Sequence, residues 1–329
     1  MGNRFAFRTV VAFALVGLGA CGEVDPDAVP RTNLITGSTG SSWYTIGAAV
    51  AERTNMGFPG HPLTGVPGAG GVSNPARVAR LGDDMGITHL PFLRAAYHGT
   101  EPYNEAYPEL RHVATLIENK FHVLFVDRLG ISSFEEIVDG RMGVRIGAGP
   151  PGSGEEFLLG EVMRYYGITV DSLRAWGGRL DLLGTGQRAD AWRDHHIEVI
   201  AFSINDPASV VTEMLHARSA RLWEMPGDLL RELEEAWGVR DSEIPGGTYP
   251  GHDDPVRTAG LQATIFAHED VDDRVVYALT KTMAESREYL LTVHSGFRVW
   301  EVEDMLVNSG VPRHPGAARY YRERGWLEP

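Results

Sequence analysis

Two stretches of the chain share one local pattern, and this pattern constrains the fold more than any other feature. In each, a short apolar run leads into a loop rich in glycine and serine, and then into an amphipathic segment of helical length. The first unit spans 33–54, with its loop at 37–42, and the second spans 142–166, with its loop at 147–154. Strands that alternate with helices predict an α/β fold with a mainly parallel sheet.

Two long apolar runs suggest how such units are joined. Val113–Asp127 and Thr258–Ala267 have the length of strands that cross from one lobe to another. We therefore predict a first lobe formed by residues 32–118 together with 259–329, and a second lobe formed by 119–258. Further elements are expected as strands at 85–88 and 198–203, and as helices at 75–81, 188–194 and 272–292, with Asn74 as the N-cap of the helix at 75–81.

The N-terminus is typical of a bacterial export signal. Arg4 and Arg8 precede an apolar stretch, Val10–Leu18, that is too short to span a bilayer. Leu18-Gly19-Ala20-Cys21 then resembles a lipobox, which predicts removal of residues 1–20, lipidation of Cys21 and a linker over 21–31. The alternative is a buried cysteine near an ordinary cleavage site. N-myristoylation is excluded, because Ala6 occupies the position that requires Ser or Thr.

The charge balance excludes some partners. With 30 basic and 44 acidic residues the formal net charge is -14. Nucleic-acid binding requires a basic stripe, and the sequence contains none. An anionic ligand is compatible with this charge only where local donors attract it.

The two glycine-rich loops are candidates for such donors. A loop of this kind exposes backbone N–H groups at a helix N-terminus, which favours a negative group. The alternative is that the glycines only turn the chain. The second loop also resembles a nucleotide-binding P-loop, but Glu155 and Glu156 stand where Lys and Ser or Thr are required, so we exclude nucleotide hydrolysis. Ser153 and Glu156 instead fit a helix capping box.

No catalytic or metal-binding motif is recognisable. The histidines have no zinc-ligand spacing, and no serine lies in a G-x-S-x-G turn. The single cysteine, Cys21, forms no internal disulfide. We therefore expect no cofactor, no metal and no enzymatic activity.

Together, the motifs resemble one known family. The segments 36–47, 70–74 and 147–155 resemble the first, second and third loops of the TAXI family of TRAP transporter solute receptors, and 244–251, 275–281 and 314–317 also match its pattern in order. The resemblance implies a two-lobed periplasmic-binding-protein fold with hinge crossover strands and a ligand cleft between the lobes. It also implies a membrane permease partner, a ligand such as glutamate, glutamine or 2-oxoglutarate, and a monomer that is lipid-anchored outside the cytoplasm. In two places the chain departs from the pattern: His89-Leu90-Pro91 replaces a Gln-Ser-Asp turn, and Ser38 and Thr39 replace glycines.

The predicted site lies between the two loops. We expect the ligand to contact Ser38, Thr39, Ser41, Ser42, Tyr44, Asn74, His89, Ser153, Gly154 and Asn205. Three of these have structural alternatives: Asn74 as a helix N-cap, His89 as a strand-end residue and Asn205 as a turn residue before Pro207. Two other functions remain open, a solute sensor for a signalling partner and an exported α/β enzyme.

Overall fold

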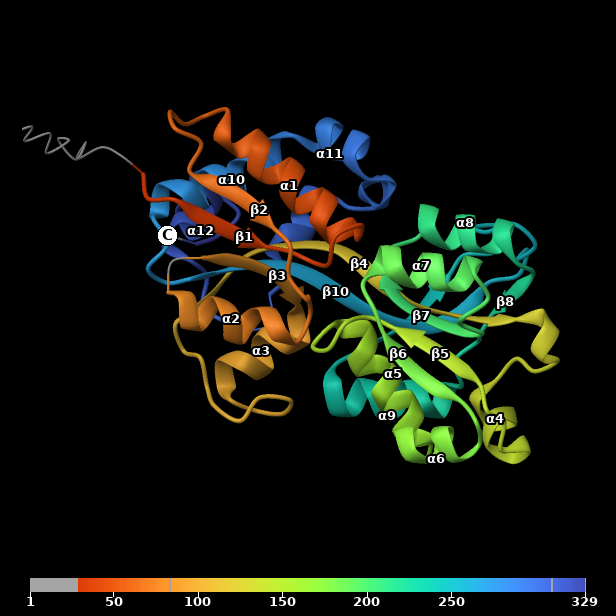
Figure 1. The fold of residues 1–329 in the computed structure, drawn as a ribbon. Coiled ribbons are helices and arrows are strands. Elements are labelled where there is room, and N and C mark those ends of the chain that lie inside the picture. Colours follow the sequence, from red (N-terminus) through yellow and green to blue (C-terminus); the bar gives the residue numbers. More distant parts are fainter. Residues whose placement is uncertain (1–28, 83, 309, 329) are drawn as a thin grey trace, which may run out of the picture.

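The computed structural model describes residues 29–82, 84–308 and 310–328. Figure 1 shows two lobes, each with helices on both faces of a shared, curved sheet. The predicted signal, Cys21 and most of the linker lie outside the described residues. In the part of the chain that is described, no helix has the length and apolar character needed to span a membrane.

One mixed sheet of ten strands runs through both lobes. Its strands are β1 Thr32–Ile35, β2 Leu63–Val66, β3 Met85–His89, β4 Leu110–Val126, β5 Arg145–Ala148, β6 Arg179–Leu182, β7 Val199–Ile204, β8 Ala220–Leu222, β9 Arg240–Ile244 and β10 Val256–His268. The order is β2-β1-β3-β10-β4-β7-β5-β6, with β8 beside β4 and β9 beside β10. The pairs β1–β2, β1–β3, β5–β6 and β5–β7 are parallel, whereas β4 and β10 run antiparallel to their neighbours. The predicted α/β fold is confirmed, but the expectation of a mainly parallel sheet is wrong, because the crossover strands β4 and β10 pair antiparallel with each of their neighbours.

β4 and β10 connect the lobes. The first part of β4 pairs with β10, from Leu110–His268 to Lys120–Gly260, and its second part pairs with β7, from Lys120–Ile204 to Phe125–Val199. Both strands are buried over most of their length, as expected for apolar crossover strands. The predicted lobe boundaries at 118/119 and 258/259 fall within these two strands and remain predictions.

The helices cover the two faces of the sheet. They are α1 Ser42–Asn55, α2 Ser73–Leu81, α3 Leu90–His98, α4 Phe134–Gly140, α5 Gly154–Tyr165, α6 Val170–Ala175, α7 Thr185–Arg193, α8 Ser209–Ala217, α9 Gly227–Trp237, α10 Asp273–Glu285, α11 Arg287–Val293 and α12 Pro315–Glu323. On one face, α1, α10 and α12 pack on the first lobe and α7 and α8 on the second, over separate apolar cores. On the other face, α2, α3, α5 and α9 share one core that extends across both lobes (Figure 1).

Two details of the predicted helices are wrong. The single helix expected over 272–292 is divided into α10 and α11 at Ser286. Asn74 is not an N-cap, because α2 begins at Ser73, two residues before the predicted start at Pro75, and Val72 takes the N-cap position. The side chain of Asn74 is instead used inside the protein, as described below.

Candidate functional site

A small cavity of about 30 Å³ lies between the two lobes. The first lobe lines it with Gly37, Ser38, Ser41, Ser42, Trp43, Ala69, Gly70, Gly71 and His89, and the second with Gly154, Glu155, Thr185, Phe202, Ser203 and Ile204, while Asn119 comes from β4. At roughly 10–15 Å³ per water, the cavity has room for about two water molecules. The lobes must therefore separate to admit a larger solute.

Three helices begin at this cavity. Ser41 is the N-cap of α1 and Ser42 its first residue, Gly154 is the first residue of α5, and Thr185 is the first residue of α7. The first N–H groups of a helix have no partner within the helix, and the helix dipole places partial positive charge there. Because α1 belongs to one lobe and α5 and α7 to the other, a negative group in the cavity is attracted from both sides.

The loops of the two lobes also contact each other directly beside the cavity. Oγ of Ser38 lies 3.3 Å from Oγ1 of Thr185, and the Thr185 N–H donates to the same Ser38 oxygen at 3.4 Å. These are weak neutral hydrogen bonds. The hydroxyls of Ser38 and Thr185, one from each lobe, therefore lie beside the cavity and can rotate toward a ligand there.

His89 is a buried polar group in the cavity wall. Its ring is 2% exposed, packs 4.7 Å from the ring of Trp43, and has no hydrogen-bond partner for either nitrogen among the described residues. Burial lowers the pKa of His89 from 6.5 to about 3, because the charged form loses hydration. The neutral imidazole offers one donor and one acceptor. An unpaired buried histidine is costly, so a ligand with complementary groups would stabilise it.

Behind the cavity lies a buried ion pair that sequence inspection missed. Arg188 in α7 is fully buried and donates to Glu155 Oε1 at 2.9 Å and to the Ala201 carbonyl at 3.0 Å. Its guanidinium also stacks on the Phe202 ring, 4.3 Å from the centroid. Burial lowers the pKa of Arg188, and the charge of Glu155 opposes this shift. Because Arg188 neutralises Glu155, the carboxylate in the wall does not by itself exclude an anion.

Asn119 and Ser203 are also missed by sequence inspection. Asn119 accepts the Trp43 indole N–H at 3.2 Å and donates to the Ser203 carbonyl at 3.0 Å, which links the two lobes through β4. The Ser203 hydroxyl has no partner among the described residues. Neither residue lies in a motif. The only signal was the position of Ser203 at the end of a predicted strand, where parallel strands usually contribute binding residues.

Half of the predicted ligand contacts line the cavity. They are Ser38, Ser41, Ser42, His89 and Gly154. The predicted wall residue Tyr44 does not line it, and neighbouring Trp43 takes that place, because Trp43 is the residue of α1 that faces the first lobe's buried core. Thr39 is exposed at the tip of the loop and does not line the cavity either.

The other three predicted contacts lie outside the cavity lining, because each side chain already has a structural partner. Asn74 Nδ2 donates to the carbonyls of Thr36 and Ile87, both at 2.8 Å, and so fixes the first loop. Ser153 Oγ accepts the Glu156 N–H at 3.2 Å, which confirms the predicted helix cap. Asn205 Nδ2 lies 2.8 Å from Nδ1 of His294.

A second, larger hollow lies nearby but has the wrong charge for an anion. It is an open groove of about 1110 Å³ between α3 and α9. Four carboxylates line it, from Glu101, Glu234, Glu235 and Asp304, with Arg94, His98 and Arg240. The C-terminus of α9, the negative end of its dipole, also lies there at Trp237 and Gly238. We therefore take the small cavity between the lobes as the candidate site.

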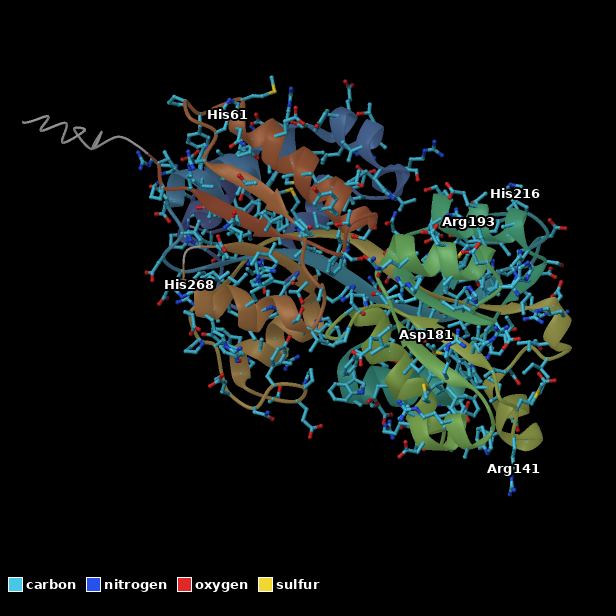
Figure 2. All side chains as sticks on the ribbon, viewed as in Figure 1. His61, Arg141, Asp181, Arg193, His216 and His268 are labelled. Carbon is cyan, nitrogen blue, oxygen red and sulfur yellow. The ribbon has the colours of Figure 1, made fainter. Side chains whose placement is uncertain are left out.

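No metal site is found in the described ranges. No group of three or more His, Cys, Asp or Glu side chains among these residues is arranged to hold a metal ion. Figure 2 shows His61 and His216 at the outer ends of different lobes, far from each other. The scattered histidines of the sequence thus do not meet at one place.

Comparisons with known proteins agree with this architecture. A family model described as the NMT1-like family matches residues 34–325. Among solved structures, MatC from Rhodopseudomonas palustris with bound malate is 15% identical, covers 82% of this chain and 89% of that one, and superposes with a TM-score of 0.53. The periplasmic binding protein BugD is 11% identical, with 90% and 95% coverage and a TM-score of 0.55. A periplasmic transporter structure is 15% identical, with 92% and 95% coverage and a TM-score of 0.51. At these identities the likeness establishes the two-lobed binding-protein fold.

Proposed function

This chain belongs to the NMT1-like family, and we propose that it is an extracytoplasmic receptor that holds a small carboxylate-bearing solute between its lobes and delivers it to a membrane transporter. One observation carries this proposal: three helix N-termini, contributed by both lobes, meet at one small cavity. The malate bound to MatC, a protein of the same fold, supports a carboxylate as the ligand.

The cavity favours a solute with hydrogen-bonding groups beyond one carboxylate. The helix N-termini donate only through N–H groups, and Ser38, Ser42 and Ser203 add hydroxyls. His89, kept neutral by burial, supplies one donor and one acceptor. Glutamate, glutamine and 2-oxoglutarate, the ligands implied by the resemblance to TAXI receptors, all carry a carboxylate and further polar groups.

Binding in this cavity requires hinge motion. A cavity of about 30 Å³ is too small for a solute of glutamate size, and the lobes are joined by the two long strands β4 and β10. A ligand that touches both lobes favours the closed form, because it makes more contacts there. We propose that the solute enters an open form and is then enclosed.

A thermal-shift screen tests the ligand class. The mature protein is heated with L-malate, L-glutamate, L-glutamine or 2-oxoglutarate, and with choline and putrescine as cationic controls. A solute that binds only the folded state raises the unfolding temperature. We expect at least one carboxylate to raise it and both cations to leave it unchanged. If no carboxylate has an effect and a cation does, the proposed ligand class is wrong.

The transporter and the anchor are proposals of finer detail. The resemblance to TAXI receptors implies a TRAP-type permease, and the lipobox at Cys21 implies an acylated N-terminus that holds a monomeric receptor near it. Mass spectrometry of membrane-extracted protein tests the anchor: an acylated Cys21 as the first residue supports it, and an unmodified N-terminus at another residue contradicts it.

A further inference from the structure

The N-terminus of α2 is capped from the other lobe. Its N-cap residue, Val72, has no side chain that can cap, and no side-chain cap bond is present there. Instead, the N–H groups of Val72 and Ser73 both donate to the carbonyl oxygen of Gly152, at 2.9 and 3.0 Å, and the Ser73 N–H is shared with the Gly70 carbonyl of its own lobe at 3.1 Å. Gly152 belongs to the loop before α5 in the second lobe. The acceptor of the Val72 N–H thus lies in the other lobe, and the Ser73 N–H has one acceptor in each lobe.

Only glycine fits at position 152 when the lobes are in contact. Gly152 has a φ of +81°, a conformation that other residues adopt at a cost. A Cβ at this position would lie 2.8 Å from Cβ of Ser73 and 3.3 Å from its Oγ. The backbone strain is present in any arrangement of the lobes. The contact with Ser73 exists only while the lobes touch, because Ser73 is in the first lobe.

The Gly152 carbonyl is held in place from its own lobe. The N–H of Gly152 donates to Oε2 of Glu156 at 3.3 Å, and the Glu156 N–H donates in turn to Oγ of Ser153. Ser153 is the N-cap of α5, and Glu156 lies in its first turn. The lobes also meet at Gly154, the first residue of α5, where a Cβ would lie 2.6 Å from Cε1 of His89. The capping motif therefore orients the Gly152 carbonyl toward α2.

We propose that the Gly152 carbonyl and the Val72 and Ser73 N–H groups form a clasp that stabilises the closed arrangement of the lobes. In this role Gly152 is a positioning residue: it does not line the cavity and acts by bringing Gly154 and His89 together. The consequence for binding rests on the proposed receptor function, but the clasp itself does not.

Gly152→Ala tests the clasp, with Gly167→Ala as a matched control. Gly167 also has a positive φ, +67°, lies in the same lobe, and has no neighbouring atom within 4 Å of the position that a Cβ would occupy. Both variants therefore carry similar backbone strain, and only Gly152→Ala meets the other lobe. The double variant Gly152→Ala with Ser73→Gly removes the Ser73 side chain that the new Cβ meets.

Amide hydrogen exchange and X-ray scattering, both without added solute, provide the readouts. For Gly152→Ala we expect exchange at residue 72, whose N–H donates to the Gly152 carbonyl, to be about tenfold faster or more and the radius of gyration to increase. Gly167→Ala is expected to behave like the parent, and the double variant to return toward the parent. Equal exchange in the two single variants, or a double variant as open as Gly152→Ala, would overturn the clasp.

Val72→Pro covers the case in which Gly152→Ala does not fold. Val72 has a φ of −79°, which proline accepts, and proline is tolerated at the start of a helix. This change deletes one donor of the clasp and leaves the loop at 147–154 untouched. We expect the radius of gyration without solute to increase, and a parent-like radius would contradict the proposal. Since no solute is present, a failed ligand screen leaves this result unaffected, and a failed clasp leaves the screen unaffected.

Discussion

The two glycine-rich loops have the same local construction and contribute to the cavity in different ways. In each, a serine caps the following helix: Ser41 Oγ accepts the Tyr44 N–H and Ser153 Oγ accepts the Glu156 N–H, both at 3.2 Å. The loop at 37–42 presents the side chains of Ser38, Ser41 and Ser42 to the cavity, whereas the loop at 147–154 presents the backbone of Gly154. Equal capping motifs therefore do not imply equal contacts with a ligand.

The reason for this difference is how each loop is held. The loop at 37–42 is fixed by its cap at Ser41 and by Asn74, which donates to the carbonyls of Thr36 and Ile87, and its serines line the cavity. The loop at 147–154 is fixed by its own cap and by the contact of Gly152 with α2. Its side chains are used for structure, and only its backbone reaches the ligand site.

Asn74→Ala should have the largest effect on this comparison. Asn74 is fully buried, and its loss removes the side-chain donor that the carbonyls of Thr36 and Ile87 share. Unsatisfied buried groups cost about 1–3 kcal/mol each, so we expect the free energy of unfolding to fall by about 3 kcal/mol in urea denaturation. Asn308→Ala, which removes one partly buried hydrogen bond to the Val311 carbonyl and one exposed bond from the Gly310 N–H, is the control. A loss below that of the control would show that Asn74 does not fix the loop.

The pH dependence of stability should reveal His89, which lies where the two loops meet. Its pKa in the folded protein is about 3, below the ordinary value near 6.5, so the unfolded state binds more protons in this window and stability falls as the pH falls. At about 1.4 kcal/mol per proton and pH unit, His89 contributes a loss of about 2 kcal/mol between pH 6 and pH 4.5.

Urea denaturation of His89→Gln at both pH values measures this contribution. We expect the loss of stability on acidification to be about 2 kcal/mol smaller than in the parent. His216→Gln, at an exposed position on α8 (Figure 2), should leave the loss unchanged. An acid loss identical in His89→Gln and in the parent would mean that His89 is not buried in a neutral form.

The two capping serines should have similar effects on stability. Ser41→Ala and Ser153→Ala each remove one side-chain cap, which is worth about 1 kcal/mol. We expect each change to lower the free energy of unfolding by about that amount, as measured by thermal or urea denaturation. A much larger loss for Ser153→Ala would mean that this loop depends on more than the cap, contrary to the similarity of the two local structures.

Ser38→Ala should have the smallest effect and should separate binding from stability. The Ser38 hydroxyl contacts the Thr185 hydroxyl at 3.3 Å and accepts the N–H of Thr185, the first residue of α7, at 3.4 Å, both across the lobes, and it does not cap α1, whose N-cap is Ser41. A neutral hydrogen bond is worth about 0.5–1.5 kcal/mol, so calorimetry should show two- to tenfold weaker binding of whichever carboxylate stabilises the parent. Unfolding in the absence of solute should change by less than about 0.5 kcal/mol. Unchanged affinity would remove Ser38 from the site.

Much of the fold was predictable from the sequence, because it depends on local patterns. The apolar runs gave both crossover strands, and the two strand, loop and helix units gave β1, α1, β5 and α5 within a few residues of their observed bounds. The cap at Ser153 was also predictable, since S-x-x-E acts between residues close in sequence. The short elements β6 and α3 were not predicted, because a few residues carry little periodic pattern. α9 was not predicted either, although its buried residues Leu229, Leu230 and Leu233 follow a clear amphipathic pattern.

The tertiary structure decided which polar side chains reach the cavity. Asn74, Ser153 and Asn205 are residue types that bind ligands well, but packing gave each a partner inside the protein. Arg188, Asn119 and Ser203 lie in no motif and are brought to the cavity by α7, β4 and β7. Local sequence determines helices, strands and caps, because these interactions span a few residues. Which side chain faces a ligand depends on contacts between lobes that lie far apart along the chain.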